Sequence, residues 1–261
     1  MAHAVMKVDD LPRLLSTICS LAQPFSQNDF YRKLQRRRAL GISAREDNFF
    51  LARKIGLIQG SRDSYYRTEL GQTICNSLTR GDVNSTKKHL GNALRLKEPN
   101  FAKFLEYLRT PRSYPDIVRW SNEAAAGTLI YWGDWLGLTE YRIKTGKYFL
   151  LPRRRLKLDN VKFWDVLWRS YLGERRTHVP GIRSPFVKIP QIRDTVCSLT
   201  GMSIPHFDRA LVALLDDSEY SDRIELSTAP LTRFLDDRHQ FRSGTKPLKY
   251  NGRSYYYIGL K

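Results

Sequence analysis

Apolar residues recur at helical spacing near the start of the chain. Within residues 9–23, one stripe contains Leu11, Leu14, Leu15, Ile18, Cys19 and Ala22. Positions three and four residues apart lie on one face of a helix, so this stripe predicts a helix with a buried side. Pro24 ends the pattern. Ser26 then begins a second, capped helix that turns Phe30 and Leu34 inward.

A third helix is predicted after the basic run Arg36–Arg38. Ser43 and Glu46 have the spacing of a capping box, and the helix runs to Gly56. One face of this helix contains Ala44, Asn48, Leu51 and Ile55, and another contains Arg45, Phe49 and Arg53.

The pattern then changes from helix to hairpin. Residues 57–59 and 65–67 have strand character, and the glycine- and aspartate-containing turn between them is typical of a hairpin. Side chains alternate along a strand, so we expect one of Tyr65 and Tyr66 to point inward and the other outward. Thr68 caps the helix that follows.

The order of these elements resembles a known family. Residues 8–80 combine three helices with the sequence GLI at 56–58, a basic hairpin and the sequence TELG at 68–71. In this they resemble winged helix-turn-helix DNA-binding domains of prokaryotic regulators. The resemblance implies that residues 43–55 enter the major groove and that the hairpin, residues 59–67, lies on the flanking backbone or minor groove.

The candidate DNA-binding residues of this first unit lie on the third helix, the hairpin and the basic run before them. They are Arg36, Arg37, Arg38, Arg45, Phe49, Arg53, Lys54, Arg62, Tyr65 and Arg67. Cationic side chains bind phosphates, and arginine also binds guanine edges. The alternative interpretation is that these charges are only solvated and that Phe49 belongs to a dimer contact or to the edge of a core.

The same order of elements recurs near residue 100. A stripe of Phe101, Phe104, Leu105 and Leu108 is followed by helices that begin near Ser113 and Asn122. Residues 137–152, GLTEYRIKTGKYFLLP, then repeat the opening of the first hairpin, and Gly137 follows Gly56 by 81 residues. This internal similarity predicts a second winged-helix unit.

In the second unit the hairpin is basic, whereas the third helix is almost uncharged. The candidate contacts are Arg142, Lys144, Lys147, Arg153, Arg154 and Arg155. We expect this unit to bind the DNA backbone more than to read bases. Trp132 and Trp135 are expected in a core or an interdomain contact rather than on a base-stacking surface.

A third, divergent unit is predicted over residues 156–261. Its first helical stripe contains Val161, Trp164, Leu167, Trp168, Tyr171 and Leu172, and its second contains Ile192, Val196 and Leu199. Strands at 223–227 and 254–260 would form its hairpin, with an inserted helix near 230–235. Clustered acids favour a protein contact over DNA in this unit.

The predicted fold is therefore mainly α with small β-hairpins (α+β), in three tandem winged-helix units. The predicted domains are 1–82, 83–155 and 156–261, and a helical connector near residues 84–97 joins the first two.

The net charge of the chain indicates which class of partner it binds. The chain has 44 basic and 26 acidic residues, a net charge of +18. The excess is +6 over residues 1–80, +7 over 81–155 and +5 over 156–261, so it is not confined to a tail. Such a surplus across folded segments favours a polyanion, and double-stranded DNA is the expected partner. No run has the length and apolarity of a membrane span, so we expect a cytoplasmic, nucleoid-associated protein with no membrane partner.

The sequence has no recognisable signature of catalysis or metal binding. The five histidines have no metal-ligand spacing, and the sequence has no phosphate loop and no nucleophile elbow. We expect no catalytic residue, no cofactor and no metal. Cys19, Cys75 and Cys197 each fall at an apolar helical position and are expected to be reduced core residues.

These patterns favour a non-enzymatic protein that binds double-stranded DNA. It would act in transcription regulation or replication initiation, or as the DNA-docking subunit of a larger prokaryotic complex such as an antiviral defence system. The alternative is a winged-helix protein–protein interaction subunit of a chromosome-organising or replication complex. A protein partner of residues 156–261 and a homo-oligomer both stay open.

Overall fold

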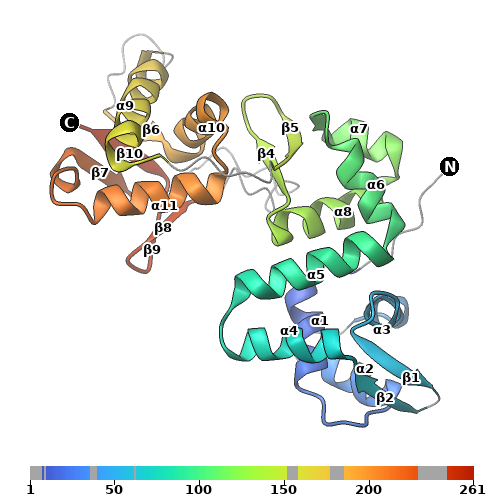
Figure 1. Cartoon of the computed structure of the whole chain (residues 1–261). Helices are drawn as coiled ribbons and strands as arrows, with labels where there is room; N and C mark the ends of the chain where they lie inside the picture. Colours follow the sequence, from blue (N-terminus) through green and yellow to red (C-terminus); the bar gives the residue numbers. More distant parts are fainter. Residues whose placement is uncertain are drawn as a thin grey trace. The chain divides into compact units, whose positions relative to one another are not determined.

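A computed structural model describes residues 8, 10–35, 40–61, 63–151, 158–176, 185–228 and 246–261 (Figure 1). The fold class is confirmed: the described residues form α-helices and small antiparallel strand pairs. The chain divides into two compact units, Met1–Thr139 and Glu140–Lys261, where three domains were predicted. The division falls inside the predicted second domain.

The first half of unit 1 contains four helices and a hairpin. They are α1 (Leu11–Cys19), α2 (Gln27–Gln35), α3 (Ile42–Lys54), β1 (Ile58–Ser61), β2 (Ser64–Arg67) and α4 (Glu69–Thr79). In the hairpin Ile58 lies opposite Arg67 and Gly60 opposite Tyr65. Phe25, between α1 and α2, bridges Tyr65 through two backbone hydrogen bonds of 2.9 and 3.0 Å. A single-residue bridge thus joins the segment between α1 and α2 to the two-stranded hairpin.

The second half of unit 1 begins with a long helix. Its elements are α5 (Val83–Lys97), α6 (Pro99–Tyr107), β3 (Arg112–Ser113), α7 (Tyr114–Trp120) and α8 (Glu123–Leu136). Helix α5 packs against α4, α6 and α8 (Figure 1). The predicted connector is therefore part of a common core with both of its neighbours, which is why residues 1–139 form one unit.

Several helix starts match their predicted caps. The Ser26, Thr68 and Asn122 side chains each accept a backbone amide hydrogen bond, from Asp29, Gly71 and Ala125 at 2.8–3.1 Å. The predicted capping box of α3 is wrong, because the helix begins at Ile42 after Gly41 and has no side-chain cap. Ser43 lies one residue inside the helix, too late to cap it.

The prediction for two of the cysteines is also wrong. Cys19, at the end of α1, forms a disulfide with Cys75 of α4. Helices α1 and α4 pack together, which brings two residues 56 positions apart to a Cα–Cα distance of 5.2 Å. Cys197 is free and buried, as predicted.

Unit 2 contains a small mixed fold around a three-stranded sheet. Its elements are β4 (Thr139–Arg142), which starts at the last residue of unit 1, β5 (Lys147–Leu150), α9 (Asn160–Arg176), β6 (Val187–Lys188), α10 (Ile189–Thr200), α11 (Ile204–Leu215), a 3₁₀ turn (Ser221–Arg223), β7 (Ile224–Ser227), β8 (Leu248–Tyr250), β9 (Arg253–Tyr255) and β10 (Tyr257–Leu260). Strand β10 lies between β6 and β7, with Ile258 opposite both Val187 and Leu226.

The predicted strand at 254–260 is in fact two strands. Residues up to Tyr255 pair with β8, whereas residues from Tyr257 pair with β6 and β7. The core of unit 2 contains Phe163, Leu167, Val196 and Phe207, but the predicted inward residues Val161 and Leu199 are 61% and 70% exposed. The helix predicted near 230–235 lies outside the described residues.

The order of elements recurs three times along the chain. Each repeat has a helix, a short extended segment, two helices and a pair of strands, in the series α1, Phe25, α2, α3, β1, β2; then α6, β3, α7, α8, β4, β5; then α9, β6, α10, α11, β7, β10. The third repeat has the additional strands β8 and β9 between β7 and β10. In the first and third repeats the short segment pairs with the last strand. The third helix of each repeat is thus α3, α8 or α11.

Candidate nucleic-acid interface

An aromatic row connects α2, α3 and the first hairpin in unit 1. The Phe49 ring lies at the centre, 6.0 Å from the ring centroid of Tyr31 and 5.0 Å from that of Tyr65. It also meets Phe30 edge to face at 5.3 Å. Such T-shaped contacts place the positive ring edge against a negative face, so they fix ring orientation as well as burying area.

An arginine lies at each end of this row. The Arg45 Cζ is 5.5 Å from the Tyr31 ring centroid, and the Arg53 Cζ is 5.5 Å from that of Tyr65. Arg53 is exposed and Arg45 is half-buried. The two residues are eight positions apart on α3, or about 12 Å along its axis at 1.5 Å per residue. Cation–π contacts hold both guanidinium groups along one side of α3 in the free protein.

Two predicted contact residues are buried, which corrects their placement on the DNA surface. Phe49 is 1% and Tyr65 is 5% exposed, so neither ring is available to a ligand. Their sequence neighbours are the exposed members, with Phe50 at 47% and Tyr66 at 45%. The expected split of the two tyrosines is confirmed, but sequence reasoning missed Phe50 because α3 has no sharp apolar face to orient it.

Lys54 and Arg67 have structural partners within unit 1. The Lys54 Nζ lies 2.7 Å from the Glu98 carboxylate, which is 1% exposed. The Arg67 guanidinium donates to the backbone oxygen of Cys19 at 2.9 Å. Loss of Lys54 would leave the buried Glu98 carboxylate without its partner, and loss of Arg67 would remove the donor to the Cys19 carbonyl, so both cations stabilise unit 1.

Seven other predicted contact residues lie outside the described residues: Arg36, Arg37, Arg38, Arg62, Arg153, Arg154 and Arg155.

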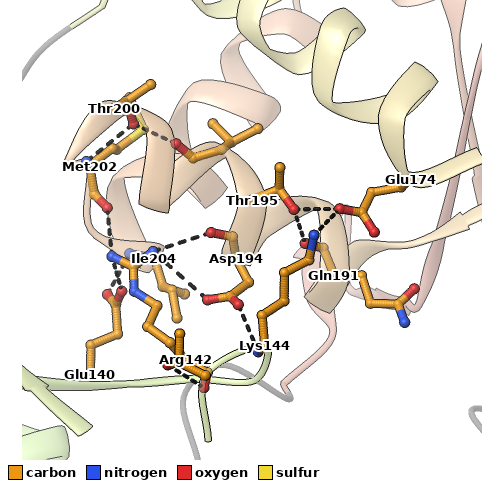
Figure 2. A network of polar contacts seen from close by, with 12 residues as sticks. Glu140, Arg142, Lys144, Glu174, Gln191, Asp194, Thr195, Thr200, Met202 and Ile204 are labelled. Atoms are coloured by element: carbon orange, nitrogen blue, oxygen red, sulfur yellow. Dashed lines mark hydrogen bonds and ion pairs between the residues drawn. The ribbon is translucent and has the colours of Figure 1, made fainter. Parts of the chain in front are cut away.

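The second hairpin is bound within unit 2 by acids (Figure 2). Arg142 is 8% exposed and lies 2.7 Å from a Glu140 carboxylate oxygen. Its guanidinium also donates to the backbone oxygen of Met202 at 3.3 Å. Lys144 forms an ion pair with Glu174 of α9, and its backbone amide donates to the Asp194 carboxylate at 2.9 Å.

Arg142 is therefore a correction to the predicted set because it is buried, whereas Lys144 is exposed and has an ion-pair partner in Glu174. Their charges are neutralised by Glu140, Asp194 and Glu174, two of which lie at least 30 residues away in sequence. Lys147 is exposed and stays a candidate.

Glu140 also completes the start of a helix. Its carboxylate accepts a 2.7 Å hydrogen bond from the Ile204 amide at the first residue of α11. Ser203, the preceding residue, makes no side-chain cap. Burial raises the pKa of Glu140 from 4.5 to about 7, against the opposing effects of the Arg142 charge and the Ile204 amide. This network fixes the hairpin to the start of α11.

The third helix of the second repeat, α8, has no lysine or arginine, and most of its residues are buried or half-buried. Trp132 of α8 is fully buried, as expected, and its indole N–H donates to the Val8 carbonyl at 2.8 Å. Leu129 and Ile130 are also buried. Unit 1 contains two helices that are third in their repeat, α3 and α8. Of these, α3 is the one whose exposed side carries cations.

Within the described ranges, no group of three or more His, Cys, Asp or Glu side chains is arranged to hold a metal ion. None of the helices in these ranges has both the length and the apolarity needed to cross a bilayer.

Comparisons with models of protein families, with curated proteins and with solved structures give no match for this chain. Function is therefore inferred from the residues and their geometry.

Proposed function

We propose that this chain is a non-enzymatic protein that binds double-stranded DNA through α3 and the β1–β2 hairpin of unit 1. The observation that carries the proposal is the pair Arg45 and Arg53, held along one side of α3 by the rings of Tyr31 and Tyr65. Guanidinium groups oriented before binding lose less side-chain entropy when they contact phosphates or guanine edges.

Two features of the whole chain support this proposal. The net charge of +18 favours a polyanionic partner. The order of helices and strands in unit 1 is the one expected from the winged-helix resemblance, in which the third helix enters the major groove.

DNA contact is assigned to unit 1 in preference to the rest of the chain. In unit 2 Arg142 and Lys144 bind acids, and the start of α11 is occupied by Glu140. A role for unit 2 in protein contact is favoured by Val161 and Leu199, which are 61% and 70% exposed. This division suits a DNA-docking subunit of a larger complex, including a defence complex, or a regulator that recruits a second protein.

The test is duplex binding over a salt series. We expect binding to a random-sequence duplex at low salt, with a log–log slope of about −0.9 for each phosphate neutralised. Arg53→Glu should weaken binding by about tenfold and make the slope shallower by about one unit.

A matched variant controls for charge alone. Arg109 is exposed in the turn that follows α6 in unit 1, and it forms an ion pair with Glu106 of that helix. Arg109→Glu makes the same charge change away from α3 and should have a much smaller effect. The proposal fails if no binding is seen at low salt, if the slope is near zero, or if the two variants behave alike.

A further inference from the structure

The outward side of α3 carries an apolar row. Ile42 is 68% and Phe50 is 47% exposed, and Glu46 lies exposed between them. The three residues follow at four-residue spacing, so they share one side of the helix. The row extends about 12 Å along the axis, which equals three to four base-pair steps of 3.4 Å.

This exposure is concentrated on the proposed DNA-binding elements. Among the described residues, seven large hydrophobic side chains are exposed, and three of them, Ile42, Phe50 and Tyr66, lie on α3 and β2. Arg53 is exposed three residues after Phe50, so a cation borders the apolar row. The occupant of this side should therefore offer negative charge to Arg53, a hydrogen-bond donor to Glu46, and small apolar groups to Ile42 and Phe50.

The major groove of DNA offers that combination in one form. Its base edges present hydrogen-bond donors and acceptors and a single apolar group, the C5-methyl of thymine. Methylation of cytosine places a methyl group at the same C5 position. Where no such methyl is present, Ile42 and Phe50 would lie against polar base edges, which would lose their hydration without gaining a hydrogen bond. A C5-methyl group removes this cost because it gives the two side chains an apolar surface to contact.

We propose that α3 selects C5-methylated pyrimidines in duplex DNA through Ile42 and Phe50. This inference rests on the proposed function, because it needs α3 in the major groove. Glu46 accepts from the N4 amino group of cytosine or the N6 amino group of adenine. The methyl group has two sources, thymine and 5-methylcytosine, which the experiment separates.

The test compares random-sequence duplex pools that differ only in pyrimidine methyl groups. One pool is synthesised with dUTP in place of dTTP, and another with 5-methyl-dCTP in place of dCTP. Each contacted methyl should raise affinity about fourfold, the value of burying one methyl-sized group. Weaker binding to the uracil pool identifies thymine, and tighter binding to the methylated-cytosine pool identifies 5-methylcytosine.

Variants assign the effect to the apolar row. Phe50→Ala and Ile42→Ala should each reduce the preference for the methylated pool while keeping the salt slope. Ile42 is the more exposed of the two, so its variant keeps the test valid if Phe50→Ala fails to fold. Leu199→Ala removes a side chain that is 70% exposed in unit 2 and should leave the preference unchanged.

The outcomes separate this inference from the proposed function. Salt-dependent binding with equal affinity for all pools overturns methyl selection and leaves DNA binding standing. Absence of duplex binding overturns both. Self-association that Phe50→Ala abolishes, measured by sedimentation velocity without DNA, would assign the row to a second copy of the chain and overturn the inference.

Discussion

Replacing Cys19 with serine opens the covalent loop that the Cys19–Cys75 disulfide closes in unit 1. The two cysteines are 56 residues apart, and α2, α3 and the β1–β2 hairpin lie between them. The cross-link restricts the unfolded chain, and the loop-closure model gives about 4 kcal/mol of stability for a loop of this length. Whole domains have about 5–15 kcal/mol, so this variant should lose a large share of the stability of unit 1.

Guanidinium unfolding measures this loss. In a Trp164→Phe, Trp168→Phe background, the remaining tryptophans all lie in unit 1 and report its unfolding by fluorescence. Cys19→Ser should lower the free energy of unfolding of unit 1 by about 4 kcal/mol, and reductant should lower that of the parent chain by a similar amount. Reductant should have no further effect on the variant.

A thiol count and a second variant complete the test. The denatured, unreduced chain should expose one thiol, from Cys197, and the reduced chain three. Cys197→Ala should keep the full response to reductant. The reasoning is refuted if three thiols titrate without reductant, or if Cys19→Ser and the parent chain differ by less than about 1 kcal/mol where a loss of about 4 is expected.

Three further substitutions test packing and charge. Phe49→Ala should lower the free energy of unfolding by about 3–5 kcal/mol, as for other buried phenylalanines, whereas a near-neutral result in denaturant titration would place the ring at the surface. Gly71→Ala should lower the melting temperature, although alanine favours helices by about 1 kcal/mol, because an added Cβ would lie 2.1 Å from the Leu57 carbonyl oxygen; a rise in melting temperature would contradict that close approach. For Glu140 the folded pKa of about 7 exceeds the ordinary glutamate value of 4.5, so the folded chain holds an extra proton between these pH values and stability falls as pH rises through them. The free energy of unfolding should fall by about 3 kcal/mol at most from this group. Urea unfolding at pH 5 and pH 8 measures the difference, which Glu140→Gln should reduce; an unchanged difference would assign the pH dependence to other groups.

Elements with a strong local signal were predicted well. The stripe of Phe101, Phe104, Leu105 and Leu108 is buried, and the caps at Thr68 and Asn122 form as expected. In these cases hydrophobic period and capping chemistry act within a few residues, so the sequence contains the whole cause.

The short strand segments could not be predicted. Phe25 pairs with Tyr65 as a single residue, and β6 has two residues. One or two residues have no alternation to detect, and their extended conformation depends on a partner strand far along the chain. The same limit applies to Phe50, because the exposed side of α3 depends on where Tyr31 and Tyr65 lie.

Charge state depends on distant partners as well. Arg142 and Lys144 have the sequence pattern of a basic hairpin, yet Asp194 and Glu174 lie beside them in the fold. Cys19 and Cys75 are likewise joined only because α1 and α4 pack together. In each case the tertiary partner reverses the local interpretation.

The hydrogen bond from the Ile204 amide at the start of α11 to Glu140 of β4 limits which repeats could replace one another. Glu140 gives the Ile204 amide the acceptor that Ser203 does not supply. If the third repeat were transferred without this hairpin, the Ile204 amide at the start of α11 would lose its acceptor. If the hairpin were transferred alone, Glu140 would lose the helix start to which it is bonded. Although their order of elements is the same, the repeats are not interchangeable modules. We expect recombination between copies to preserve function only where the breakpoint keeps residues 140–261 together.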